Sequence, residues 1–284
     1  MVFDKFFLFP NFTFHMQIFG LKTDIIQPNE DLIAHIEQSL KDANLTLQYK
    51  DILVLGETVV ATTQGRVIDL KTVKKIRPEA TSLSKQYQMD PRLVELVLQE
   101  CSAILGGVDH VLLAEIGGLL IANAGIDQSN AGGDENVVFL PKDLQNTADV
   151  IRKELEQRHK VKIGIILADS RVQPLKVGLI GMALAVSGFQ PVIDCRGRKD
   201  LFGRVLRIKQ MAVADDIASA AQLLMGECDE AVPFALVRGA PVNFTDETPQ
   251  SMVMPASECL FMNIFAKFFT NIKEKAEQGK IEKT

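Results

Sequence analysis

The pattern of apolar and polar positions along the chain predicts a mixed α/β fold. Short apolar runs without helical spacing are typical of strands buried in a sheet. Such runs lie at 51–55, 108–114, 116–122, 162–168 and 235–237. Segments whose apolar residues recur every three or four positions are typical of helices that bury one face. These segments lie at 29–40, 90–105, 146–159 and 212–225. Strands and helices therefore alternate, which is the order of an α/β protein.

Residues at the ends of these segments predict where the helices begin and stop. Asn29, Asp90 and Asn146 each stand at the start of a helical segment, where their side chains can accept hydrogen bonds from free backbone amides. Gly226 follows the fourth helical segment and suits the left-handed conformation that ends a helix. The run 177–186 is small and apolar, which indicates close packing and not a binding site.

The two ends of the chain differ from its middle. We expect residues 16–248 to form the main domain and residues 1–15 to be an N-terminal extension upstream of a start at Met16. The extension is far shorter than the roughly 20 residues of a membrane span and lacks the cleavage site of a signal peptide. Residues 249–284 are expected to form a C-terminal amphipathic helix from Ser257 onward. Its aromatic stripe, typical of a core or dimer contact, is Phe261, Phe265 and Phe268.

Composition and charge exclude several classes of protein. The 284 residues carry a net charge of −5, which argues against a nucleic-acid partner, and no segment is expected to enter a membrane. The four cysteines are scattered without a C-x-x-C pair, so neither a zinc site nor a disulfide framework is expected, and a reducing cytoplasm fits best. The chain has no P-loop, no G-x-G-x-x-G after a strand and no G-x-S-x-G elbow. Its four histidines lack ligand spacing.

Acidic residues follow several of the predicted elements. A polar segment at 123–130, which we call the polar knot, contains Asp127 and follows an apolar run. Asp169 and Ser170 end another predicted strand, and Glu227 follows a helix-capping glycine. Carboxylates at strand ends are the usual ligands of Mg²⁺ or Mn²⁺ beside phosphate oxygens. Each acid taken alone is better explained as part of a polar turn or a solvated loop. Their joint occurrence predicts a metal and phosphate site.

A basic segment at 196–204 could supply the cations of such a site. It combines three arginines and a lysine with two glycines, a composition suited to gripping phosphate or carboxylate groups. A solvated hairpin turn explains the same composition. Both readings stay open at this point.

Five motifs in a fixed order give the chain a family resemblance. They are Asn-Ala-Gly-Ile-Asp-x-Ser-Asn at 123–130, Asp-Ser at 169–170, Gly-Arg-Lys-Asp-Leu-Phe-Gly-Arg at 197–204, Ala-Val-Ala-Asp-Asp-Ile-Ala at 212–218 and Met-Gly-Glu at 225–227. Together they resemble the coenzyme F420-0:gamma-glutamyl ligase family (CofE-like). The resemblance runs from Gly20 to Pro241 and so covers most of the chain.

The resemblance implies a fold and a reaction. The fold is the CofE-like ligase fold, neither P-loop nor Rossmann, in a cytoplasmic homodimer. The reaction is a GTP-dependent ligation of L-glutamate to the carboxylate of a deazaflavin precursor, coenzyme F420-0, with release of GDP and phosphate. It requires Mg²⁺ or Mn²⁺, two ions per subunit, and allows a monovalent cation. An acyl phosphate is the simplest way to activate the carboxylate, and no covalent nucleophile of the protein is expected.

By position, the resemblance also assigns roles to residues. Asp127 and Asp169 match the ligands of one metal ion, and Ser170 and Glu227 match the ligands of a second. The expected nucleotide contacts are Gly20, Leu21, Lys22, Thr23, Glu57, Thr58, Thr62, Asn130, Met225, Gly226, Glu227, Cys228, Asp229 and Glu230. The candidates for binding phosphate or substrate are Arg171, Lys176, Arg198, Lys199 and Arg204.

The chain departs from the family pattern inside the expected site. The family pattern Asp-Ser-Phe-Gly-Arg-Pro-x-Arg is Asp-Ser-Arg-Val-Gln-Pro-Leu-Lys at 169–176, so Gln173 and Lys176 replace arginines. Thr62 stands where the family has a lysine. Arg171 could restore one of the lost charges. The chain is then a divergent ligase for coenzyme F420-0, a paralogous ligase for a different acid, or a non-catalytic nucleotide- or deazaflavin-binding relative. The retained acids favour an enzyme.

Overall fold

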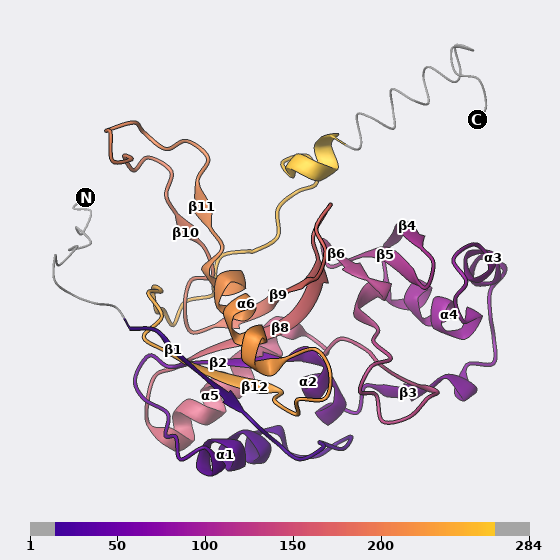
Figure 1. The fold of residues 1–284 in the computed structure, drawn as a ribbon, viewed down its shortest axis with the longest axis horizontal. Coiled ribbons are helices and arrows are strands. Elements are labelled where there is room, and N and C mark those ends of the chain that lie inside the picture. The colour runs from indigo at the N-terminus through magenta and orange to yellow at the C-terminus, as the bar shows by residue number, and fades with distance from the viewer. Residues whose placement is uncertain (1–14, 265–284) are drawn as a thin grey trace. The chain divides into compact units, whose positions relative to one another are not determined.

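The computed structural model describes residues 15–264, which fall into two compact units (Figure 1). Among the described residues, the large unit contains 15–74 together with 125–250, and the small unit contains 75–124 together with 251–264. The main domain expected at 16–248 contributes to both units. The N-terminal extension, apart from His15, lies outside the described residues.

A five-stranded sheet forms the centre of the large unit. Its order is β1-β12-β2-β8-β9. The strands are β1 (Gln17–Leu21), β12 (Phe234–Arg238), β2 (Ile52–Gly56), β8 (Gly164–Val172) and β9 (Leu179–Ser187). β2 and β8 are parallel, while β12 is antiparallel to both of its neighbours. Strands β1, β2 and β8 therefore run in the same direction, and their carboxyl ends lie at one edge of the sheet.

One face of this sheet carries a hydrophobic core with helices α1 (Leu32–Asp42) and α5 (Leu144–His159). Ile33, Ile36 and Leu40 form the buried stripe of α1, which confirms the helical spacing predicted there. They pack in one cluster with alternate residues of β2 and β8, because successive strand side chains point to opposite faces.

Helix α6 (Val213–Met225) packs against β9 at the point where the sequence predicted close packing. A Cβ atom on Gly181 would lie 2.5 Å from the backbone carbonyl carbon of Ala218. The glycine lets the backbones of strand and helix approach this closely. Gly226 ends α6 with the positive φ that its position predicted, 77°, but its ψ of −174° lies outside the predicted left-handed conformation.

The large unit contains several shorter elements. They are α2 (Glu57–Thr63), β3 (Val67–Asp69), the 3₁₀ turn η1 (Leu70–Thr72), β7 (Asn136–Val138), β10 (Ile193–Asp194) and β11 (Gln210–Met211). β3 pairs with β7 and β10 pairs with β11, each antiparallel. The segment between β10 and β11 is a long hairpin.

The small unit combines a helix pair with a three-stranded antiparallel sheet. The helices are α3 (Pro78–Gln86) and α4 (Pro91–Glu100), and the strands are β4 (Ala103–Val108), β5 (Val111–Ile116) and β6 (Leu119–Ala122). The 3₁₀ turn η2 (Asn123–Gly125) follows β6. Asp90 accepts a hydrogen bond from the amide of Arg92 at 2.8 Å, which confirms the predicted start of α4.

Two predicted helix starts were wrong. Asn29 has a left-handed φ of 67°, and Asp31 caps α1 by accepting from the amides of Ile33 and Ala34. Helix α5 begins at Leu144, two residues before the predicted cap Asn146, after Asp143 with φ of 44°. Left-handed residues redirect the chain just before a helix, and sequence patterns do not reveal them reliably.

Three other predicted boundaries in the small unit were also wrong. Helix α4 ends at Glu100 and not at Leu105, because residues 103–108 pair with β5 as strand β4. The predicted strand 116–122 is interrupted, since Gly117 and Gly118 form a turn between β5 and β6. The C-terminal helix begins at Leu260 and not at Ser257, while Phe265 and Phe268 lie outside the described residues.

Candidate functional site

The carboxyl edge of the central sheet gathers segments that are far apart in the sequence. β1 and β2 end here, and β12 begins here after the loop 226–233. The amide of Gly56 donates a hydrogen bond to the carbonyl of Pro233 at 2.9 Å. The amide of Thr23 donates to the carbonyl of Ala231 at 3.0 Å. Three of the predicted nucleotide-binding segments therefore meet at one edge.

The end of α6 and the loop behind it lie against the ends of β1 and β2, most tightly at Gly20. A Cβ atom on Gly20 would lie 3.0 Å from the Cγ1 atom of Val232. A Cβ atom on Gly56 would lie 3.7 Å from the Cε atom of Met225. The segment 225–233 thus covers the ends of β1 and β2.

Asp169 extends from the same edge on β8. Its neighbour Ala168 pairs with Gly56, so Asp169 lies just beyond the last paired residue of β2. The amide of Ser170 donates to Asp169 Oδ1 at 2.6 Å. The sequence predicted that the strand ends at these two residues, but β8 continues to Val172 through pairing with β9. Because strand side chains alternate, Asp169 and Ser170 point to opposite faces of the sheet.

The acids at this edge share one electrostatic environment. Burial, followed by the negative charges of Asp127 and Glu227, raises the pKa of Asp169 from 3.8 to about 7. Burial, followed by the charge of Asp169, raises the pKa of Glu57 from 4.5 to about 8. A hydrogen bond from the Thr58 hydroxyl to Glu57 Oε1, at 2.6 Å, opposes that rise. Asp127, Asp169, Glu227 and Glu57 form what we call the carboxylate cluster.

Glu57 was predicted from the sequence as a nucleotide contact only and was not placed among the metal-binding acids. It occupies the first turn of α2, directly after β2. The signal was present in the sequence, because a glutamate that follows a buried strand is placed like Asp169. The proximity of the two acids depends on the parallel pairing of β2 with β8, which the order of residues does not reveal.

Backbone pairing fixes the position of Asp127. Its amide donates to the carbonyl of Val138 at 2.9 Å, and the amide of Val138 donates back at 2.8 Å. The amide of Ser129 donates to Asp127 Oδ1 at 2.9 Å, and the Ser129 hydroxyl donates to the other carboxylate oxygen. The polar knot is therefore partly an Asx-type turn, which agrees with the polar turn considered in the sequence analysis. The same turn holds Asp127 at the cluster.

The polar knot also connects to the loop behind α6. The Asn130 side-chain amide donates to the carbonyl of Cys228 at 3.2 Å. In that loop Gln222 donates to Glu227, and the amide of Cys228 donates to Glu230 Oε2 at 2.8 Å. Asn123, at the start of the knot, belongs to the small unit, where its side chain accepts from the amide of Leu112 at 2.9 Å.

The carboxylate cluster is not a preassembled metal site. Within residues 15–264, no group of three or more histidine, cysteine, aspartate or glutamate side chains converges closely enough to hold an ion. The donor set is nevertheless suited to a hard divalent cation, because a positive ion stabilises like-charged carboxylates that lie near one another. Asp127, Asp169 and Glu57 are half-buried, and Glu227 is exposed. Thr62 contributes less than the other candidates, since its hydroxyl donates to the carbonyl of Thr58 inside α2 at 2.7 Å.

The basic candidates differ in their placement. Arg171, on β8, is half-buried. Lys176 is exposed in the turn between β8 and β9. Arg198, Lys199 and Arg204 are exposed on the hairpin between β10 and β11, which leaves the central sheet in Figure 1. The hairpin reading of that segment is confirmed: Asp200 accepts from the amides of Phe202 and Arg204. No hydrogen bond or ion pair of a described residue links these three cations to the carboxylate cluster.

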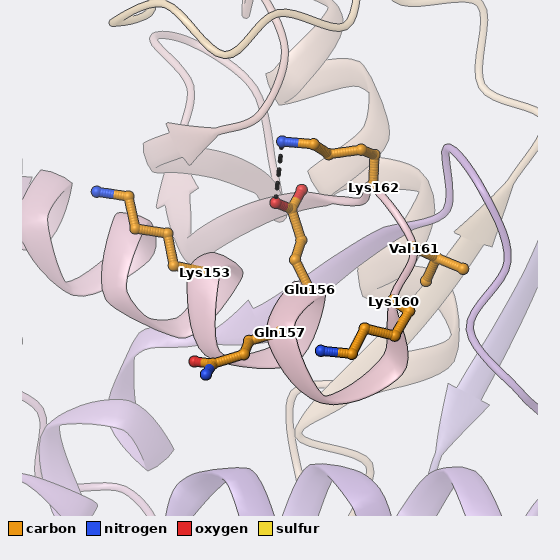
Figure 2. Close-up of a pocket in the computed structure, with 6 residues that line it drawn as sticks. All are labelled: Lys153, Glu156, Gln157, Lys160, Val161 and Lys162. Atoms are coloured by element: carbon orange, nitrogen blue, oxygen red, sulfur yellow. Dashed lines mark ion pairs between the residues drawn. The ribbon is translucent and has the colours of Figure 1, made fainter.

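A hollow of about 280 Å³ lies elsewhere on the large unit, at the end of α5 (Figure 2). Its lining residues are Lys153, Glu156, Gln157, Lys160, Val161 and Lys162. Lys162 pairs with Glu156 at 3.3 Å. The hollow adjoins the start of β8, at the opposite end of the strand from Asp169. Its three lysines are exposed and its one acid, Glu156, is paired with Lys162, so we place the candidate site at the carboxylate cluster instead.

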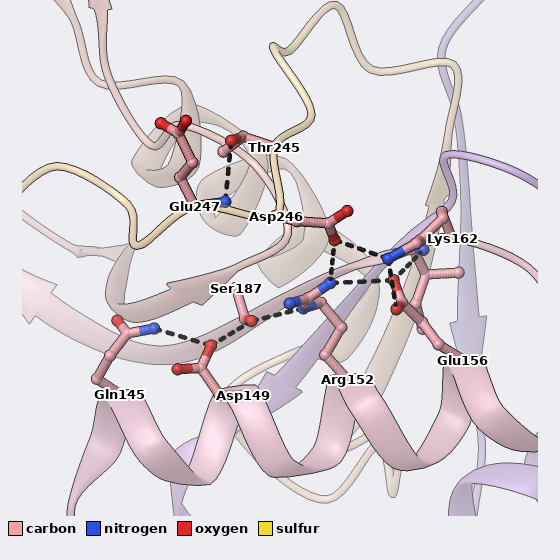
Figure 3. A network of polar contacts seen from close by, with 10 residues as sticks. Gln145, Asp149, Arg152, Glu156, Lys162, Ser187, Thr245, Asp246 and Glu247 are labelled. Carbon is pink, nitrogen blue, oxygen red and sulfur yellow. Dashed lines mark hydrogen bonds and ion pairs between the residues drawn. The ribbon is translucent and has the colours of Figure 1, made fainter.

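A second polar network, shown in Figure 3, serves the fold. The buried Arg152 donates to the Ser187 hydroxyl at 2.8 Å, to Glu156 at 3.2 Å and to Asp246 at 3.1 Å. Lys162 reaches Asp246 at 2.7 Å. These contacts attach the segment after β12 to α5 and β9. With its charges satisfied, the network stabilises the large unit.

Comparison with known proteins agrees with the resemblance in the sequence. Residues 20–239 match the model of the family described as F420-0:Gamma-glutamyl ligase. The chain is 34% identical over 249 residues to the coenzyme F420:L-glutamate ligase of Methanocaldococcus jannaschii, covering 87% of this chain and 97% of that protein. It is 36% identical over 215 residues to the enzyme of the same name from Methanopyrus kandleri, covering 75% of this chain and 82% of that protein.

Proposed function

This chain belongs to the F420-0:gamma-glutamyl ligase family, and we propose that it joins L-glutamate to coenzyme F420-0 with GTP and a divalent metal. The observation that carries the proposal is the carboxylate cluster at the carboxyl edge of the sheet. Asp127, Asp169 and Glu227 come from three separate segments, yet their charges act on one another there. Residues of this type and placement are suited to a metal nucleotide.

The proposed reaction needs activation of a carboxylate before an amine can attack it. A carboxylate oxygen of coenzyme F420-0 attacks the terminal phosphorus of GTP, the bond to GDP breaks, and an acyl phosphate forms. The amino group of L-glutamate, after losing a proton, then attacks the acyl carbon, and inorganic phosphate leaves as the amide bond forms. No side chain of the protein has to form a covalent bond, which is consistent with the absence of a nucleophile motif.

Asp127 and Asp169 are proposed to hold one Mg²⁺ or Mn²⁺ ion, and Ser170 and Glu227 a second. Bound there, the ions would neutralise the oxygens of the transferred phosphoryl group. Asp169 and Ser170 lie on opposite faces of β8, which supports assigning them to two different ions. The raised pKa of Asp169 supports the same assignment, since a cation would offset the crowding of negative charge.

The nucleotide is proposed to lie along β1, β2 and the loop before β12. Gly20 to Thr23, Glu57 with Thr58, Asn130 and residues 225–230 line that side of the cluster, and hydrogen bonds join several of these segments. The proposed glutamate and deazaflavin substrates follow from the family. A homodimer, a monovalent cation and a cytoplasmic location remain predictions from the resemblance. Among the described residues, no helix is long and apolar enough to cross a membrane.

The loop 171–176 favours one second candidate, a paralogous ligase for a different acid. Gln173 and Lys176 stand where the family pattern has arginines, and neither offers the planar fork that binds carboxylate or phosphate in two places. A different acceptor acid would explain why these two arginines are replaced while the acidic residues of the cluster are retained. The non-catalytic alternative predicts loss of the acids first, and Asp127, Asp169 and Glu227 are all present.

A direct assay separates these functions. Purified protein is incubated with GTP, Mn²⁺, L-glutamate and coenzyme F420-0, and the product is followed by mass. We expect a product heavier by one glutamyl residue together with GDP. Asp169→Ala should abolish both, whereas the exposed control Asp134→Ala should retain them. GTP binding without any product would indicate a binding protein. GDP formation that requires a different acid would indicate the paralogous ligase. An unchanged rate in Asp169→Ala would overturn the assigned site.

A further inference from the structure

Arg171 is the basic candidate that is half-buried, and no described carboxylate forms an ion pair with its guanidinium. Its Nε atom is buried and has no hydrogen-bond partner. Its Nη1 atom has only the sulfur of Met182 at 3.6 Å, and a thioether sulfur is a weak acceptor. The other four basic candidates are exposed. A buried donor that lacks an acceptor is unfavourable, so this arginine is placed to receive an anion.

Strand geometry places Arg171 beside the carboxylate cluster. Arg171 follows Asp169 by two residues on β8, so both side chains lie on the same face, roughly 7 Å apart along the strand. Asp169 pairs with Met182 on β9, and Arg171 pairs with Ile180. The guanidinium forms no ion pair with a described carboxylate, and Asp127 and Glu227 are the charges that act on Asp169. Arg171 is therefore available to a ligand.

Sheet order indicates which ligand it receives. The proposed contacts Gly20 to Thr23 and Glu57 with Thr58 lie at the ends of β1 and β2, and residues 225–230 lie in the loop before β12. In the strand order these three strands are on one side of β8, while Arg171 lies on the part of β8 that pairs with β9, on the other side. In-line phosphoryl transfer needs the nucleotide and the attacking oxygen on opposite sides of the transferred group. The attacking oxygen belongs to the acceptor carboxylate.

We propose that Arg171 binds the acceptor carboxylate that becomes activated. This proposal rests on the proposed ligase function. The planar guanidinium matches a carboxylate through two parallel N–H···O bonds. Arg171, on β8, would take over the role of the arginines that the family pattern has at positions 173 and 176. It is a specificity-determining residue for acids and distinguishes them from neutral acceptors.

Binding and kinetics of paired ligands test this role. The probes are coenzyme F420-0 and its carboxyl methyl ester, titrated by deazaflavin fluorescence against the wild type, Arg171→Gln and Arg171→Lys. Arg171→Gln should weaken binding of the acid about tenfold and leave binding of the ester within roughly twofold. Arg171→Lys should lie between, because an ammonium keeps the charge and lacks the fork. Arg207→Gln removes the same charge from an exposed position and should change neither.

The outcomes separate this proposal from the proposed function. Equal weakening of acid and ester, or no weakening of either, overturns the role of Arg171 while the ligase assignment stands. A higher KM for GTP or for L-glutamate, with unchanged binding of coenzyme F420-0, also overturns it and assigns Arg171 to that substrate. A wild-type protein that neither binds nor glutamylates coenzyme F420-0 overturns the proposed function itself. Arg171→Lys keeps the test decisive if Arg171→Gln folds poorly.

Discussion

Replacing Asp169 by asparagine should stabilise the metal-free protein at alkaline pH, although the change removes a proposed metal ligand. Burial, together with the charges of Asp127 and Glu227, raises the pKa of Asp169 from 3.8 to about 7 in the folded protein. An acid whose pKa is raised by folding binds more protons in the native state than in the unfolded state. Its contribution to the free energy of unfolding therefore falls as pH rises through the interval between the two pKa values.

The size of this effect follows from the pKa shift. A rise from 3.8 to about 7 is about three units, and at about 1.4 kcal/mol per unit it corresponds to at most about 4 kcal/mol. Asp169 and Glu57 interact, so this penalty belongs to the two acids jointly. Between pH 5 and pH 8 we expect Asp169→Asn to gain about 1–3 kcal/mol in unfolding free energy over the wild type.

Urea unfolding in the presence of EDTA, measured at several pH values from 5 to 8, provides the assay. Asp134→Asn, an exposed aspartate of the same unit, is the matched control and should follow the wild type at every pH. Addition of Mn²⁺ should then stabilise the wild type and leave Asp169→Asn nearly unchanged. If the difference between wild type and Asp169→Asn does not grow with pH, Asp169 does not carry a buried, crowded charge, and the electrostatic argument for the cluster fails.

Three further predictions concern the fold and the proposed nucleotide side. Arg152→Met should cost about 3–5 kcal/mol in urea unfolding, because Glu156 and Asp246 lose their buried partner, while the exposed control Lys153→Met should cost less than about 0.5 kcal/mol. Gly181→Ala should cost about 1–3 kcal/mol, since its Cβ would overlap the backbone of Ala218; Gly133→Ala, whose Cβ would lie 3.4 Å from the side-chain nitrogen of Asn136, is the control, and equal losses would contradict the packing argument. Asn130→Ala should raise the KM for GTP more than the KM for L-glutamate, as measured in the product assay with Gln128→Ala as control; equal changes in both KM values would count against a nucleotide role.

The residues of the candidate site could be named from the sequence, but their spatial relations could not. Asp127, Asp169 and Glu227 stand out because each follows a strongly patterned element. The extent of β8 past Asp169 depends on pairing with β9, and local patterning does not register that contact. Glu57 joins the cluster because β2 pairs in parallel with β8, more than a hundred residues further along the chain. The exposure of Arg198, Lys199 and Arg204 on the hairpin between β10 and β11 likewise became known only from the structure.

The sequence by itself determined the fold class, the helices α1, α4, α5 and α6, the central strands β2, β8 and β12, and the family, because side-chain periodicity and motifs are local properties of the chain. Only the tertiary structure decided the strand order β1-β12-β2-β8-β9, which brings separate acids to one edge and places the proposed nucleotide contacts and Arg171 on opposite sides of Asp169. It also decided that Arg171 is half-buried, with a buried Nε atom and no ion pair to a described carboxylate, whereas the other basic candidates are exposed. Burial and charge interaction arise from neighbours distant in sequence, so they exist only once the sheet has formed.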